Sequence, residues 1–251
     1  MAERLDGTVA LVTGASSGIG AATAQALARQ GARLAVVARR KDRLDALAEE
    51  IGGDVLVIEA DITDREQAIG AVRRTVDELG RLDTVVNNAG VMLLGDAEDA
   101  PLDEWDQMVA INVLGLLYVS HAAIQPLLAA AQDGPRNVAD MVNISSIAGR
   151  RASRGSGVYN LTKHGVGAFS ESLRQEFADR RVRVSLVEPG AVITELVDHM
   201  RPEEQEAARQ RFEGVERLAA EDIADIVEYI VTRPARVAVN EVMVRPTNQA
   251  W

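Results

Sequence analysis

Tyr159 and Lys163 are the two residues whose types and spacing are best suited to chemistry. Phe169, Leu173 and Phe177 continue a helical pattern after them, so the tyrosine and the lysine share one helical face, with Cβ atoms about 5–6 Å apart. A phenol with an ordinary pKa of about 10 can protonate an alkoxide as hydride arrives at a carbonyl. A nearby ammonium lowers that pKa by about 1–3 units, which makes the reverse reaction feasible as well. The pair therefore predicts proton transfer in a carbonyl–alcohol interconversion, although taken alone it is usually structural.

A glycine-rich segment, residues 13–20, follows the first predicted strand and reads Thr-Gly-Ala-Ser-Ser-Gly-Ile-Gly. Glycines at a strand-to-helix turn let the backbone approach a pyrophosphate, which the N–H groups and dipole of the helix then hold. The spacing differs from the usual dinucleotide fingerprint, so it predicts phosphate binding without fixing a family, and a plain tight turn is the alternative. The residues predicted to bind the cofactor here are Gly14, Ser16, Ser17, Gly18, Ile19 and Gly20.

Arg39 and Arg40 end the second predicted strand, at the position that distinguishes the two nicotinamide cofactors. An NAD-binding enzyme places an acidic residue there on the ribose hydroxyls, whereas an arginine accommodates the 2′-phosphate of NADP. Arg39 offers a planar fork of donors to a phosphate, with Arg40 beside it. We therefore predict NADP(H) rather than NAD(H). The alternative is that these arginines, with Lys41 and Arg43, form the solvated start of a helix.

The elements that must position these residues are short β-branched runs that alternate with longer helical patterns, which predicts β-α-β repetition. Because the runs are apolar on both faces, they belong in a parallel sheet with helices on each side. Right-handed crossovers then give a doubly wound, Rossmann-like α/β fold, with one domain over residues 1–251. The predicted strands are 9–12, 33–38, 55–59, 83–86, 141–144, 182–187 and 242–244, and two helices are 20–30 and 64–79.

Two segments stand apart from this alternation. Residues 129–137 are small and polar and contain Gly-Pro, which predicts a surface loop. Residues 195–215 are rich in Arg, Glu and Gln and follow a Pro-Gly turn, which predicts a helical excursion that could serve as a substrate lid. A solvated helix with no gating role fits the same composition.

Composition disfavours several classes of protein. Hydrophobic residues make up 47% of the 251 and charged residues 26%, as in a globular protein, and no stretch reaches the roughly 18 uninterrupted apolar residues of a membrane helix. The net charge of -11 disfavours nucleic acids and anionic membranes as partners. With no cysteine and three scattered histidines, we expect no metal site. Residues 1–6 lack the apolar core of a signal peptide, so we expect residence in the cytoplasm.

Over essentially its whole length the sequence resembles the short-chain dehydrogenase/reductase family. The resemblance rests on the glycine motif, the Tyr159/Lys163 pair, Asn-Asn-Ala-Gly at 87–90, Ser-Ser at 145–146 and Pro-Gly at 189–190. It implies a catalytic tetrad of Asn112, Ser146, Tyr159 and Lys163. In that tetrad Ser146 would hold the substrate oxygen near the phenol, Lys163 would bind the nicotinamide ribose, and Asn112 would hold a water that links the lysine to solvent. A strand-end cap for Ser146 and a buried amide for Asn112 are the structural alternatives.

The same resemblance implies further contacts with the cofactor. Asp61 and Ile62 would lie around the adenine, although an acidic residue that ends a strand is often only a helix cap. The other implied contacts are Asn88, Ala89 and Gly90 along the path from ribose to nicotinamide, and Pro189, Gly190, Val192 and Thr194 against the carboxamide.

The substrate is expected to be a small or medium ketone, aldehyde or secondary alcohol, because the candidate pocket wall is mostly apolar. That wall comprises Met92, Leu93, Leu94, Ser153, Val158, Val192, Ile193 and Leu196. Arg151 and Arg154 could meet an acidic substrate or be exposed loop charges. Within the family, the phrases at 91–95, 145–150, 187–190 and 244–247 look most like clavulanic acid dehydrogenases and NADP-dependent 3-hydroxy-acid or serine dehydrogenases.

Two other functions remain open from the sequence: a catalytically idle relative that senses NADP(H), and an NAD-dependent alcohol dehydrogenase. By analogy with the family we expect a homotetramer or homodimer, with the helices that carry Asn112 and Tyr159 packed between subunits. Trp251 could anchor a subunit contact.

Overall fold

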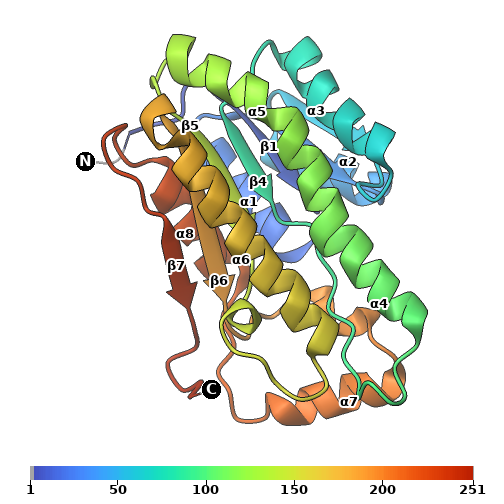
Figure 1. Cartoon of the computed structure of the whole chain (residues 1–251). Coiled ribbons are helices and arrows are strands. Elements are labelled where there is room, and N and C mark those ends of the chain that lie inside the picture. The colour runs from blue at the N-terminus through green and yellow to red at the C-terminus, as the bar shows by residue number, and fades with distance from the viewer. Residues whose placement is uncertain (1–2, 251) are drawn as a thin grey trace.

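Seven parallel strands form one sheet in the order β3-β2-β1-β4-β5-β6-β7 (Figure 1). The computed structural model describes residues 3–250, so Trp251 and its predicted subunit contact lie outside the described residues. The strands are β1 Val9–Thr13, β2 Arg33–Ala38, β3 Val55–Glu59, β4 Thr84–Asn87, β5 Ala139–Ile144, β6 Val182–Pro189 and β7 Glu241–Val244.

Helices cover both faces of this sheet (Figure 1). One buried apolar cluster joins α1, α2 and α8 to one face, and another joins α3, α5 and α6 to the opposite face. Each cluster takes alternate residues of the same strands, for example Leu11 on one side and Val12 on the other. The helices are α1 Gly18–Arg29, α2 Lys41–Ile51, α3 Arg65–Leu79, α4 Leu102–Val109, α5 Leu116–Asp133, α6 Gly157–Phe177, α7 Pro202–Arg211 and α8 Ala220–Val231.

The winding of the chain reverses between β1 and β4, the two neighbouring strands at the centre of the sheet. β2 and β3 extend the sheet to one edge, and β5 to β7 extend it to the other. In doubly wound sheets the loops at such a reversal diverge and leave a crevice beyond the carboxyl ends of the strands. The glycine-rich segment follows β1 and residues 88–90 follow β4, so both flank this crevice. The predicted doubly wound α/β fold is confirmed.

The helical run between β4 and β5 corrects one prediction. Residues Leu102–Asp133 are continuously helical through α4, the π-helical turn η1 (Ala110–Gly115) and α5. The predicted loop at 129–137 is therefore wrong over residues 129–133, because Ala130 and Ala131 are buried in the core and hold the last turns of α5 against it. By length and composition alone this run is apolar enough to cross a membrane, since its most apolar 18-residue window has a mean hydropathy of 1.6. Of that window, 44% is buried inside the protein, and core helices of soluble proteins pass the same test.

Residues 193–217, which we call the flap, form a helical excursion below the carboxyl ends of the strands (Figure 1). The flap contains the short 3-10 helix η4 (Glu195–His199) and α7. Two backbone hydrogen bonds of Leu218, one from Ile193 at 2.8 Å and one to Ala191 at 2.9 Å, close its base. Arg201 donates to Glu104 of α4 at 2.9 Å and fastens its far side. The excursion matches the predicted segment, and its role as a lid stays a prediction.

Candidate active site

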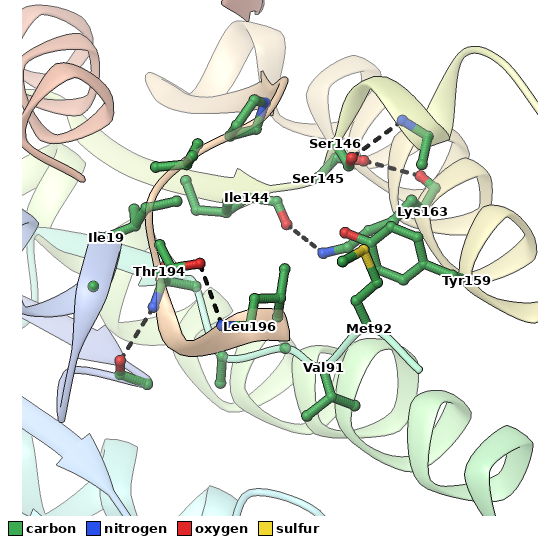
Figure 2. A pocket seen from close by; sticks show the side chains of 18 of the residues that line it. Ile19, Val91, Met92, Ile144, Ser145, Ser146, Tyr159, Lys163, Thr194 and Leu196 are labelled. Atoms are coloured by element: carbon green, nitrogen blue, oxygen red, sulfur yellow. Dashed lines mark hydrogen bonds between the residues drawn. The ribbon is translucent and has the colours of Figure 1, made fainter. Parts of the chain in front are cut away.

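A cavity of about 820 Å³ lies at the carboxyl ends of the strands, between the glycine-rich segment, the start of α6 and the flap. Figure 2 shows Tyr159 and Lys163 on one wall and Thr194 and Leu196 across from them. All but two of the predicted catalytic and cofactor-binding residues line this cavity, the exceptions being Gly20 and Asn112. Positions spread from Gly14 to Thr194 in the sequence are thus brought to one site.

Tyr159 and Lys163 lie in the first turns of α6, and both side chains are buried. Lys163 Nζ donates a hydrogen bond to the carbonyl oxygen of Ile144 at 3.0 Å and lies 5.9 Å from the centroid of the Tyr159 ring. The Tyr159 ring packs in a small apolar cluster that includes Val91 and Met108. The end of β5 therefore positions the lysine side chain, and the apolar cluster positions the tyrosine ring, so both face the cavity in a fixed arrangement.

The pKa values of this pair are governed by burial. Burial raises the pKa of the Tyr159 phenol to about 12, although a hydrogen bond with Ser146 lowers it in part. Burial also lowers the pKa of the Lys163 ammonium to about 8. The sequence predicts a lowered pKa for this phenol, and for the protein without a cofactor that prediction is wrong. The largest effect is desolvation of the phenolate, which raises the pKa. The phenol stays protonated near neutral pH, which suits it to donate a proton.

The two serines after β5 have different tasks in the structure. Ser145 turns away from the phenol and donates to the backbone carbonyl of Lys163 at 3.1 Å, which ties α6 to the sheet. Ser146 is the serine hydrogen-bonded with Tyr159, and its hydroxyl also accepts from the N–H of Ala148 at 3.1 Å. The structure therefore puts Ser146 beside the phenol, as the resemblance implies, while it also caps the short helix η2 (Ile147–Gly149).

Asn112 lies behind the cavity wall rather than on it. Its side-chain oxygen accepts from the N–H of Val91 at 2.8 Å, and its amide nitrogen donates to the Val91 carbonyl at 2.9 Å and to Thr162 Oγ1 at 3.2 Å. Gly90 separates it from Lys163, since a Cβ there would lie 3.2 Å from Asn112 Oδ1 and 3.7 Å from Lys163 Nζ. The side chain is thus occupied in holding the loop after β4. The π-helical turn that carries it is a feature often found at functional sites.

The glycine-rich segment is packed tightly against the loop after β4. Gly14 has a φ of +65°, and a Cβ there would lie 2.8 Å from the Ala89 Cα. A Cβ on Gly20 would lie 2.3 Å from the Gly14 carbonyl oxygen, so this glycine packs behind the cavity instead of lining it. The Asn88 amide donates to the carbonyl of Thr13 at 3.0 Å and braces the same turn. These contacts leave the N-terminus of α1 open to the cavity, as a phosphate group requires.

Arg39 and Arg40 both line the cavity, but only Arg40 is held in place. Arg40 donates to Ser16 Oγ at 2.9 Å, to Ser17 Oγ at 3.0 Å and to a carboxylate oxygen of Glu195 at 2.9 Å. The Arg39 side chain is exposed. The predicted alternative of a fully solvated arginine cluster does not describe Arg40.

Asp61 and Ile62, which follow β3, line the cavity, and their contact with an adenine stays a prediction. The Asp61 carboxylate accepts from the N–H and the hydroxyl of Thr63, at 3.0 and 2.8 Å. Asp61 therefore makes a turn after β3, while the cap of α3 is Asp64.

The predicted pocket wall is reproduced in part. Of its eight members, Leu93, Val158 and Ile193 do not line the cavity, and the five that do are Met92, Leu94, Ser153, Val192 and Leu196. Arg151 also lines it, whereas Arg154 lies outside and pairs with Asp96 at 2.5 Å in the surface loop.

Sequence reasoning missed several lining residues that arrive from the flap and the C-terminal segment, among them Glu195, Phe212, Arg217, Arg245 and Gln249. Gln249 is only 4% exposed and accepts a hydrogen bond from the N–H of Ala191 at 3.0 Å. A Cβ on Gly190 would lie 2.3 Å from that oxygen, so the Pro-Gly turn makes room for it. Within residues 3–250, the Gln249 amide nitrogen has no hydrogen-bond partner. No motif or periodicity marked this residue.

Comparisons with known proteins agree with this geometry. The sequence profile described as short chain dehydrogenase matches residues 8–205. The glycine betaine reductase ATRR of Emericella nidulans is 39% identical over 248 residues, which are 98% of this chain and 19% of that protein. This chain therefore spans about a fifth of the length of that relative.

The similar solved structures include complexes with nicotinamide cofactors. A serine dehydrogenase complexed with NADP+ is similar with a TM-score of 0.87 and 30% identity, over 97% of both chains. The 3-ketoacyl-(acyl-carrier-protein) reductase of Brucella melitensis complexed with NADH is similar with a TM-score of 0.85 and 28% identity, over 96% of this chain and 98% of that one.

Proposed function

This chain belongs to the short-chain dehydrogenase family of oxidoreductases that use a nicotinamide cofactor, and we propose that it interconverts a small or medium carbonyl compound and its alcohol with NADP(H). The observation that carries the proposal is the buried Tyr159 phenol, which is hydrogen-bonded with Ser146 and has Lys163 Nζ 5.9 Å from its ring centroid. It lies on the wall of a cavity that the glycine-rich segment also lines. The proposed proton donor and the proposed phosphate-binding turn thus face the same cavity.

The residues present fit such a cofactor. The tightly packed glycine turn leaves the N-terminus of α1 open to the cavity, and Arg39 and Arg40 stand at its adenosine end. When bound, the cofactor supplies or accepts hydride. Ser146 is proposed to orient the substrate oxygen toward the Tyr159 hydroxyl, which gives up its proton to that oxygen. Lys163 is proposed to bind the ribose and to keep a positive charge beside the phenol. The Asn112 side chain is committed to Val91 and Thr162, so its proposed role is to position the loop after β4.

The pH dependence of the two directions should differ. Reduction needs the protonated phenol and the charged lysine, so its kcat/KM is expected to be flat near neutral pH and to fall above about pH 8, where Lys163 loses its proton. Oxidation needs the phenolate together with the charged lysine, so its kcat/KM is expected to increase with pH up to about pH 8. Above that pH it should level off, because loss of the Lys163 proton offsets the further gain in phenolate below the Tyr159 pKa of about 12. Initial rates in both directions across this range check the prediction. A reduction rate that climbs through pH 9 would contradict it.

Cofactor preference is proposed to depend on Arg40 together with Arg39. Charge-assisted hydrogen bonds contribute about 1.5–3 kcal/mol, so Arg40→Ala is expected to lower kcat/KM for NADPH by about 10- to 100-fold and to leave NADH nearly unchanged. Arg73→Ala, on the exposed face of α3, removes the same charge far from the cavity and is the control. Equal losses with both cofactors would contradict this role of Arg40. A wild type with a higher kcat/KM for NADH than for NADPH would favour the NAD-dependent alternative, for which the NADH complex of the similar reductase is a precedent.

The substrate is proposed to be predominantly apolar around its carbonyl group, because Met92, Leu94, Val192 and Leu196 line the cavity together with Tyr159. Following NADPH oxidation over a panel of ketones, aldehydes and β-keto acids, with NADH in parallel, identifies the substrate class. β-Keto acids belong in the panel because Arg151 lines the same cavity, and because the serine dehydrogenase is a structural relative.

We further propose a homotetramer or homodimer in the cytoplasm. α5 and α6 lie side by side on the outer face of the molecule (Figure 1), and large apolar side chains are exposed on α6 and η1, at Leu161 (62%) and Leu114 (39%). Static light scattering gives the assembly state.

A further inference from the structure

Glu195 joins the flap to the basic end of the cofactor cavity. One oxygen of its carboxylate accepts from Arg40 at 2.9 Å, and the other accepts from Arg43 at the start of α2. These hydrogen bonds, Arg43's first, lower the pKa of Glu195 to about 2, so the carboxylate is charged at any working pH. The side chains of Arg40 and Glu195 are only 37% and 35% exposed. The contact is therefore a half-buried ionic bridge across the mouth of the cavity.

The surrounding geometry fixes this bridge over the glycine-rich segment. Arg40 also donates to Ser16 and Ser17, so its guanidinium lies over that turn. On the flap side, Thr194 packs against the same turn, since a Cβ on Gly18 would lie 3.1 Å from its methyl group. Glu195 follows directly and begins η4. The carboxylate thus occupies Arg40, one of the two arginines that the proposed function assigns to a 2′-phosphate, and it also occupies the neighbouring Arg43.

A carboxylate and a 2′-phosphate cannot share these donors favourably. Both are anions, and like charges in contact repel by several kcal/mol when partly removed from water. An NAD(H) molecule has only a neutral hydroxyl at that position and leaves the bridge intact. A dinucleotide with a 2′-phosphate must displace Glu195 from Arg40, and the displacement frees the start of the flap.

We propose that Glu195 is a specificity-determining residue that competes with the 2′-phosphate for Arg40 and Arg43 and couples cofactor choice to the position of the flap. This inference rests on the proposed use of NADP(H). It predicts that the carboxylate weakens NADP(H) binding selectively and that 2′-phosphate binding loosens the bridge between the flap and α2.

The test uses adenosine nucleotides that lack nicotinamide, so that it reads binding and not turnover. Calorimetry with 2′,5′-ADP and with 5′-AMP is compared for the wild type and for Glu195→Gln. Because a partly exposed ion pair is worth up to about 1 kcal/mol, the variant is expected to bind 2′,5′-ADP about three- to fivefold more tightly, with 5′-AMP changed less than about twofold. Glu206→Gln removes the same charge from the exposed face of α7 and is the matched control, expected to match the wild type.

The rate of amide hydrogen exchange in residues 195–211 measures how firmly the flap is held. In the wild type, saturating 2′,5′-ADP is expected to speed exchange there and 5′-AMP to leave it unchanged, whereas Glu195→Gln exchanges quickly without either nucleotide. Equal affinities of the wild type and Glu195→Gln for 2′,5′-ADP would overturn the inference. A different outcome is that the wild type shows no preference for NADPH and Glu195→Gln gains one. That outcome would support the inference about Glu195 and would show that the proposed NADP(H) dependence of the wild type is wrong.

Discussion

Replacement of Tyr159 by Phe is expected to lower kcat for carbonyl reduction by about 10²- to 10⁴-fold, the usual contribution of a positioned proton donor. The Kd for NADPH should change little, because the ring remains packed against Val91 and Met108 and only the hydroxyl is lost. The hydrogen bond with Ser146 disappears with it. Single-turnover reduction and NADPH fluorescence titration measure the two quantities separately.

Tyr118→Phe is the control for this experiment. Tyr118 lies on α5, outside the cavity, with Arg65 5.4 Å from its ring centroid, so loss of its hydroxyl should leave kcat within about twofold. Unchanged turnover in Tyr159→Phe would refute the proposed mechanism. If the wild type binds NADPH and reduces no member of the carbonyl panel, the idle sensor becomes the better description.

Replacement of Asp140 by Ala is expected to destabilise the protein by about 3–5 kcal/mol, because it leaves buried guanidinium groups without their counter-ion. Asp140 is 1% exposed and accepts two hydrogen bonds from Arg183, at 2.7 and 2.9 Å, while Arg136 lies at 3.5 Å. Arg183 also donates to the backbone carbonyl of Val231, the last residue of α8, and to that of Val237 beyond the helix. The cluster thus locks β5 and β6 to the segment that leads to β7.

Urea unfolding followed by circular dichroism measures this loss. Asp54→Ala removes a carboxylate whose pair with Arg33, at 2.7 Å, is exposed, and it should cost no more than about 1 kcal/mol. Because Asp140 lies at the amino end of β5, away from Ser146 at the other end, the folded variant should keep its kcat. A free energy of unfolding within about 1 kcal/mol of the wild type would contradict the prediction.

The pairing of Tyr159 with Lys163 follows from sequence spacing, whereas the electrostatic state of the pair does not. Residues four positions apart on a helix share a face, so the geometry of the pair is local. The pKa of about 12 for the phenol depends on desolvation by residues from other elements, and it reversed the expected direction. Similarly, the choice of Ser146 over Ser145 rested on the family, and its physical reason is that Ser145 is already committed to the Lys163 carbonyl.

Local patterns also failed where burial overrode composition. The alanines at 129–131 read as a loop beside Gly134-Pro135, yet two of them are buried and extend α5 to Asp133. The predicted strand 141–144 begins after Asp140, whereas β5 contains it, and an acidic residue in a buried strand is unfavourable without a partner. That partner, Arg183, lies on the neighbouring strand.

The sequence by itself determined the doubly wound parallel sheet, the glycine turn after β1 and the helical face that carries Tyr159 and Lys163. The glycine turn and the helical face depend on contacts within one element or between an element and its immediate successor, so periodicity and spacing suffice for them. The sheet also pairs the non-consecutive strands β1 and β4, and the rule of right-handed crossovers supplies that step. The tertiary structure alone decided that Glu195 meets Arg40, that Gln249 reaches Ala191 and that Asn112 stands behind the wall. Those contacts join residues 155, 58 and 21 positions apart, and only the packed chain brings them together.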